Sequence, residues 1–147
     1  QRHFSIATAE SCTGGLIASL ITDVSGSSDY FPGGIVAYAY EAKAGLLGVS
    51  WSTLNTKGAV SQETVLEMAH GARKVLSVDL AVSVSGIAGP GGGTPEKPVG
   101  STWIGLVAPD GEWSRHFIWN GNREQNKRYS SEAALQLVLD YLEGKIK

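Results

Sequence analysis

Short apolar runs and segments with helical periodicity alternate along this chain. Five runs have the length and composition of β-strands: residues 4–9, 35–39, 80–84, 101–107 and 113–119. Four segments instead repeat apolar residues with the spacing of an amphipathic helix: residues 16–24, 41–47, 61–76 and 130–142. This order of elements predicts an α/β fold in a single domain, with a mixed β-sheet of about five strands and helices packed on its faces.

The boundaries of these elements are marked by residues with known local preferences. Gly26 and Gly48 end the first two helical segments, and Ser61 is suited to cap the third. The last two strands are joined by Pro109-Asp110-Gly111, a hairpin turn. No repeat or linker divides the 147 residues, which is an ordinary length for one domain. We therefore expect residues 1–147 to form one unit.

Composition and charge exclude several classes of protein. The net charge is −2 and the basic residues are scattered, so no basic stripe is available for a nucleic acid. One cysteine excludes an internal disulfide framework, and the three histidines lie far apart without the spacing of a metal site. No apolar run approaches the ~20 residues of a membrane span. We expect a cytoplasmic protein without metal or cofactor; a homo-oligomer is compatible with the sequence.

The junction after the first strand carries the best local signal for chemistry. Ser11 follows a buried strand and precedes a helix, and open α/β sheets bind ligands at the carboxyl ends of their strands. Free amide groups at a helix start would stabilise an oxyanion there. Ser11 or Thr13 could equally be a helix cap, which is the commoner use of such residues. Cys12 is a rival nucleophile, but it lacks a histidine partner and is better interpreted as a small buried residue.

A serine nucleophile needs a base, and no histidine lies in a suitable context. Tyr38 and Lys43 bracket the end of the second strand and the start of the next helix. A lysine acts as a base if burial or nearby positive charge lowers its pKa, and a tyrosine can relay a proton. On spacing alone, a solvated Lys43 and a half-buried Tyr38 are the ordinary alternatives.

Two further segments could bind an anion. The glycine-rich residues 85–95 offer many backbone N–H groups, although they match neither a Walker loop nor a dinucleotide fingerprint. Gly121-Asn122-Arg123, before the last helix, supplies a guanidinium suited to phosphate. Each could also be purely structural: a crossover that needs positive φ angles, and a solvated surface arginine.

Taken together, these segments resemble the C-terminal domain family of CinA proteins. The similarity rests on ordered motifs: Ala9-Glu10-Ser11-Cys12-Thr13-Gly14-Gly15, Gly33-Gly34-Ile35-Val36-Ala37-Tyr38 with Glu41-Ala42-Lys43, Gly58-Ala59-Val60-Ser61, Ser85-Gly86-Ile87-Ala88-Gly89-Pro90 and Lys97-Pro98-Val99-Gly100. Known members are nicotinamide-mononucleotide deamidases that release ammonia without a metal. The resemblance implies that Ser11 is the nucleophile and that Lys43 and Tyr38 handle the proton, leaving open which of these two is the base.

The same resemblance implies a substrate site and shows some departures. We expect the nucleotide to contact residues in these motifs and in the last helix: Thr13, Gly14, Gly33, Gly34, Gly86, Gly89, Gly91, Arg123 and Arg128. The family commonly has Gly-Asp-Arg where this chain has Gly121-Asn122-Arg123, and the following arginine, Arg128, comes one residue later than expected. This shift leaves open whether Arg123, Lys127 or Arg128 contacts the phosphate. The resemblance also leads us to expect that the family's N-terminal helix is truncated before Phe4. The alternative function is a catalytically silent ligand-binding or competence-associated module of the same fold.

Overall fold

The fold is organised around strand β1, which lies between two parallel neighbours. The computed structural model describes residues 3–146. Its strands are β1 (Ile6–Glu10), β2 (Gly33–Val36), β3 (Leu80–Gly86), β4 (Ser101–Ala108) and β5 (Gly111–Ile118). They form one sheet in the order β2-β1-β3-β4-β5. β1 is parallel to β2 and β3, whereas β4 is antiparallel to both β3 and β5. The predicted mixed sheet of five strands is confirmed.

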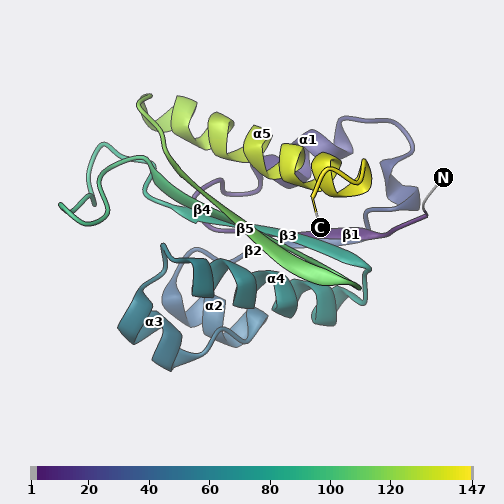
Figure 1. Ribbon diagram of the computed structural model, residues 1–147, viewed down its shortest axis with the longest axis horizontal. Coiled ribbons are helices and arrows are strands. Elements are labelled where there is room, and N and C mark those ends of the chain that lie inside the picture. The colour runs from purple at the N-terminus through teal and green to yellow at the C-terminus, as the bar shows by residue number, and fades with distance from the viewer. Residues whose placement is uncertain (1–2, 147) are drawn as a thin grey trace.

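Helices cover both faces of this sheet and make a three-layer α/β domain. They are α1 (Leu16–Thr22), α2 (Tyr40–Leu47), α3 (Trp51–Lys57), α4 (Gln62–Leu76) and α5 (Arg123–Leu142), with a short 3-10 helix η1 (Ser27–Asp29). Helices α1 and α5 lie on one face, and α2, α3 and α4 lie on the other (Figure 1). In the part of the chain that the structure describes, no helix is long and apolar enough to cross a membrane.

The two faces of the sheet carry side chains of different size. Larger aliphatic residues of β1, β3 and β4 pack toward α1 and α5: Ile6, Leu80, Val82, Val84, Ile104 and Leu106. Alanines dominate the opposite face of β1 and β3, where α4 packs: Ala7, Ala9 and Ala81. α4 also approaches α2 closely, because a Cβ on Gly71 would lie 1.8 Å from the carbonyl oxygen of Leu47. Glycine at this position therefore permits the close approach of α2, which carries Lys43.

Helix α5 is longer than the sequence predicted. It begins at Arg123, not at residue 130. The Asn122 side chain accepts a hydrogen bond from the Gln125 backbone N–H at 2.8 Å, and the Gln125 side chain accepts from the Asn122 backbone N–H at 2.9 Å. This reciprocal capping box starts the helix on a polar turn, where apolar periodicity gives no signal.

Other boundaries also differ from the prediction. α3 was not predicted; Ser50 caps it by accepting from the Thr53 backbone N–H at 3.0 Å. β2 ends at Val36 instead of residue 39. The caps predicted at Ser61 and Gly48 are confirmed.

Candidate active site

Ser11 and Lys43 meet where β1 and β2 end. Ser11 directly follows β1, and α2 begins shortly after β2. Because these strands are parallel neighbours, both ends lie at the same edge of the sheet. The Lys43 Nζ is 2.9 Å from the Ser11 Oγ. Two residues that are 32 positions apart in the sequence are thus in direct contact.

Two backbone carbonyls complete the surroundings of the Lys43 amine. The Nζ donates to the carbonyl oxygen of Ala37 at 3.1 Å and to that of Tyr38 at 2.7 Å. The Ala37 N–H still donates to the Glu10 carbonyl at 2.8 Å, and beyond it the chain leaves the sheet. β2 is shorter than predicted because these carbonyls turn toward Lys43 instead of pairing in the ladder.

Lys43 is buried, not solvated. Its side chain is among the largest fully buried ones, and the residue is 1% exposed. Burial lowers the pKa of Lys43 below its usual value, and the nearby Cys12 opposes part of that shift. A lowered pKa makes the neutral amine accessible, as a lysine base requires.

Ser11 lies in a tight turn ahead of α1. Its N–H donates to the Val84 carbonyl at 3.1 Å, which ties the turn to the end of β3, and the Gly14 N–H donates to the Ser11 carbonyl at 3.1 Å. α1 begins only at Leu16, with Gly15 at the N-cap and no side-chain cap. Ser11 is therefore not a helix cap, and its hydroxyl faces Lys43.

The Glu10 carboxylate binds backbone N–H groups at the start of α1, where the sequence analysis expected an oxyanion. It accepts the Thr13 hydroxyl at 2.5 Å and the backbone N–H groups of Ile17 and Ala18 at 2.9 and 3.0 Å. The residue is 0% exposed. A buried carboxylate is favoured at a helix N-terminus because amide donors and the helix dipole compensate its charge. Glu10 thus fixes the turn that carries Ser11, a role that the sequence analysis missed.

Cys12 is a buried residue, as predicted. Burial raises the pKa of its thiol to about 11, although a hydrogen bond to its own backbone and the charges of Lys43 and Lys127 act in the opposite direction. The thiol is therefore protonated near neutral pH. A protonated thiol without a base is a weak nucleophile.

Tyr38 touches the site through two different groups. Its carbonyl accepts from Lys43, as described above, while its side chain is 59% exposed. The Tyr38 hydroxyl accepts a hydrogen bond from the Arg123 guanidinium at 3.1 Å. Another nitrogen of Arg123 donates to the Gly89 carbonyl at 2.8 Å, and the Asn126 amide donates to the Ala88 carbonyl at 3.0 Å. The first turn of α5 therefore joins the end of β2 to the glycine-rich loop.

Three predicted binding residues lie at or near this edge of the sheet. Thr13 directs its hydroxyl to Glu10, as noted above. Gly14 has a φ of +62°, and a Cβ built on it would be 3.9 Å from the Lys127 Nζ. Gly86 ends β3, where a Cβ would approach the Thr102 hydroxyl to 2.6 Å. Their contacts with a substrate stay predictions.

Four other predicted binding residues have different surroundings. Gly33 and Gly34 lie within β2, opposite residues 7 and 8 of β1 and away from its carboxyl end. Gly91 is exposed on the loop. Arg128 is exposed and forms an ion pair with Glu132 at 2.7 Å. A role in substrate binding stays a prediction for all four.

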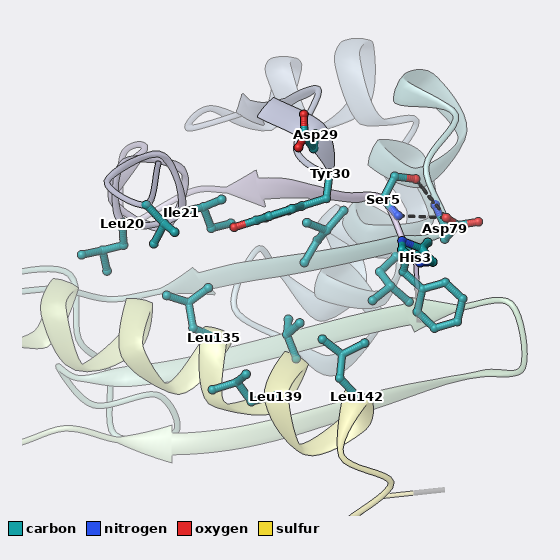
Figure 2. A pocket seen from close by; sticks show the side chains of 15 residues that line it. His3, Ser5, Leu20, Ile21, Asp29, Tyr30, Asp79, Leu135, Leu139 and Leu142 are labelled. Atoms are coloured by element: carbon teal, nitrogen blue, oxygen red, sulfur yellow. Dashed lines mark hydrogen bonds between the residues drawn. The ribbon is translucent and has the colours of Figure 1, made fainter. Parts of the chain in front are cut away.

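An apolar groove lies away from Ser11. It has a volume of about 780 Å³. Its lining includes the residues at the amino ends of two strands: Ser5 and Ile6 at β1, and Asp79 and Leu80 at β3. Figure 2 shows Leu135, Leu139 and Leu142 along it, with Ser5 hydrogen-bonded to Asp79 at one end. Among residues 3–146, no three His, Cys, Asp or Glu side chains are gathered so that they could hold a metal ion.

Comparison with known proteins identifies the family. The CinA C-terminal domain family matches residues 1–142. The nicotinamide-nucleotide amidohydrolase PncC of Escherichia coli K12 is 48% identical over 93% of this chain and 84% of its own length. A putative competence-damage inducible protein of Halothermothrix orenii is 48% identical over the whole chain. The chain spans only 36% of that relative and about a third of several others.

Solved structures agree in fold. A competence/damage inducible protein from Agrobacterium tumefaciens superposes with a TM-score of 0.91 at 42% identity, covering 93% of this chain and 84% of that one. A CinA superfamily protein from Klebsiella pneumoniae gives a TM-score of 0.94 at 29% identity, covering 97% and 89%. Sequence, fold and the ordered motifs around Ser11 lead to one assignment: the chain belongs to the CinA C-terminal domain family.

Proposed function

We propose that this chain is an amidohydrolase that converts nicotinamide mononucleotide to nicotinate mononucleotide and ammonia. The observation that carries the proposal is the 2.9 Å contact between the Ser11 Oγ and the buried Lys43 Nζ. The name of the E. coli relative, a nicotinamide-nucleotide amidohydrolase, supports this choice of substrate.

The three partners of the Lys43 amine suit a general base. A neutral lysine amine has two N–H groups and one lone pair. The carbonyls of Ala37 and Tyr38 accept from the two N–H groups, so the lone pair is directed at the third partner, the Ser11 hydroxyl. In this state the hydroxyl donates to the amine, which is the arrangement needed to remove its proton.

The reaction then has two halves. The Ser11 Oγ attacks the carboxamide carbon while its proton passes to Lys43, and the tetrahedral intermediate collapses when Lys43 returns the proton to the departing nitrogen as ammonia leaves. Water attacks the resulting ester with Lys43 again as base, which releases the carboxylate and restores Ser11. Tyr38 orients the amine through its carbonyl, and its hydroxyl assists proton movement.

Substrate binding is assigned to the polar groups around this edge. We expect the phosphate to be held by the loop of residues 86–93 together with a basic side chain of α5. Glycine-rich backbone offers several N–H donors without the entropy cost of ordering side chains. A cation of α5 adds a charge-assisted contact.

The test is to incubate the purified protein with nicotinamide mononucleotide and to measure ammonia and nicotinate mononucleotide. We expect the two products in equal amounts. Rapid quenching should also give protein whose mass is increased by the nicotinate-mononucleotide acyl group, located on the peptide that contains Ser11. Binding of the nucleotide without turnover would refute the amidohydrolase proposal and favour a ligand-binding module.

A further inference from the structure

Three basic side chains occupy the first turns of α5, and the structure gives them different partners. Arg123 is engaged within the protein, since it donates to the Gly89 carbonyl and to the Tyr38 hydroxyl. Arg128 is also engaged, because its Nε is 2.7 Å from the carboxylate of Glu132 in an exposed pair. The remaining one is Lys127.

The ammonium group of Lys127 lies beside the turn that carries the nucleophile. Its Nζ would be 3.9 Å from a Cβ at Gly14, and Gly14 closes the turn that begins at Ser11. Lys127 is half-buried, and among the residues that the structure describes its ammonium has no hydrogen-bond acceptor or anionic partner. The Glu10 carboxylate, next to this turn, already accepts hydrogen bonds from the Thr13 hydroxyl and from two backbone N–H groups at the start of α1.

The helix geometry separates Lys127 from Arg128. Residues four apart lie on the same face of a helix, so Lys127 follows Arg123 along the face that contacts the glycine-rich loop. Arg128 is rotated by about 100° from Lys127 and points to Glu132 instead. A half-buried cation without an anion, next to a catalytic turn, is stabilised when a ligand supplies the negative charge.

We propose that Lys127 binds the anionic group of the substrate, a phosphate monoester, and is the residue that selects nucleotides over uncharged carboxamides. This inference rests on the proposed function, because it places the carboxamide of the same molecule at Ser11. The hydrogen-bonded turn keeps the Cα atoms of Ser11 and Gly14 within about 7 Å. One small molecule can therefore reach both groups. Arg123 acts at this site by holding Tyr38 and the loop.

The experiment compares two substrates that differ only in the phosphate: nicotinamide mononucleotide and nicotinamide riboside. In Lys127→Met, which keeps the length of the side chain and removes the charge, KM for the nucleotide should rise about 10- to 100-fold, with kcat changed less than about threefold. For the riboside, kcat/KM should stay within about twofold of the wild-type value. Lys127→Arg should restore most of the affinity. Lys74→Gln, an exposed change on α4, is the control for loss of a lysine.

Binding of inorganic phosphate, measured by calorimetry, gives a readout that does not depend on turnover. Lys127→Met should weaken it about tenfold. If the wild-type protein releases no ammonia, the proposed function fails and this titration alone decides the role of Lys127. Equal phosphate affinity in the two proteins overturns the inference, as do equal losses on nucleotide and riboside. A nucleotide-specific loss in Arg128→Gln but not in Lys127→Met moves the phosphate contact to Arg128 and overturns it too.

Discussion

Strands β1 and β3 run in parallel from an apolar groove to a buried polar cluster, so the two ends of the same strands can be compared directly. At the amino end, Ser5 and Asp79 are joined by three hydrogen bonds of 2.9 to 3.1 Å beside the groove. At the carboxyl end, Glu10, Ser11 and Lys43 are buried around one turn. The large groove is at one end and the chemistry at the other.

The difference lies in how each end uses its polar groups. Ser5 and Asp79 satisfy one another, so their contacts serve to hold two strands together. At the carboxyl end, Lys43 is balanced by carbonyl dipoles and a hydroxyl rather than by a carboxylate. Burying an amine in this way costs stability and lowers its pKa, which is the usual cost of a base that works near neutral pH. Changes at the carboxyl end should therefore affect turnover, and changes at the amino end should affect stability.

The largest effect is expected from removing the nucleophile. Ser11→Ala should reduce turnover of nicotinamide mononucleotide on the order of 10⁴-fold or more while the fold is retained, because residues 3–146 place no other activated nucleophile at this edge. Cys12→Ala, the adjacent control, should keep most of the activity. Steady-state ammonia release and circular dichroism test both variants. An inactive Cys12→Ala together with an active Ser11→Ala would show that the mechanism uses the thiol.

The next effect concerns the base. Lys43→Arg keeps a positive charge but cannot supply a neutral amine, so kcat should fall by about 10²–10⁴-fold. Near-normal turnover in this variant would reduce Lys43 to an electrostatic role. Tyr38→Phe removes the hydroxyl but leaves the carbonyl that accepts from Lys43. A loss of similar size in Tyr38→Phe would show that hydroxyl and amine act as a unit.

At the amino end of the strands, in contrast, a substitution should lower stability and leave turnover unchanged. Asp79→Ala removes the acceptor of two hydrogen bonds from Ser5, and we expect the free energy of unfolding to fall by about 1–3 kcal/mol. kcat/KM of the remaining folded protein should be unchanged. Asp23→Ala, at an exposed aspartate, is the matched control and should change stability by less than about 0.5 kcal/mol. Urea titration with parallel assays decides this, and a loss of activity without a loss of stability would contradict the division between the two ends.

The sequence predicted the elements better than the contacts between them. Apolar runs located all five strands: β1, β3 and β4 are almost wholly buried, and β2 and β5 contain partly buried positions between exposed ones. The start of α5 was missed because polar residues, led by Asn122 and Gln125, form its first turn. The capping pair was visible in the sequence and could have been used.

Within the site, spacing along the sequence identified candidate residues but could not show which of them are in contact. Ser11 and Lys43 were both predicted, yet their contact depends on the parallel pairing of β1 with β2 and on the place of α2, which are tertiary properties. The role of Glu10 could not be predicted from the sequence, because its carboxylate accepts hydrogen bonds from backbone N–H groups seven and eight positions away. Lys127 and Arg128 are adjacent in sequence, and only the helix geometry distinguishes them.

The smallest effect is a difference in the pH dependence of stability, and it tests the buried amine directly. The ordinary pKa of a lysine is 10.5, and burial lowers that of Lys43 in the folded protein. Between the two values, the unfolded chain binds more protons at this residue than the folded chain does. The free energy of unfolding therefore rises with pH through this window. The stability gained in this way is lost again as the pH falls toward the folded pKa. Below the folded pKa, the destabilisation is complete and constant.

Lys43→Met removes this titration while filling a similar volume, and the two carbonyls left without a donor add only an offset that does not depend on pH. The free energy of unfolding of the wild type minus that of the variant should therefore rise with pH up to about 10.5 and be flat below the folded pKa. Urea unfolding of both proteins at a series of pH values measures this difference, and Lys74→Met, at an exposed lysine, should show no slope. The acid limb of kcat/KM should begin at the lower edge of this window, the folded pKa of Lys43, since both curves report the same proton. A flat difference would mean that the amine stays charged in the fold, and a charged amine cannot take the proton of Ser11.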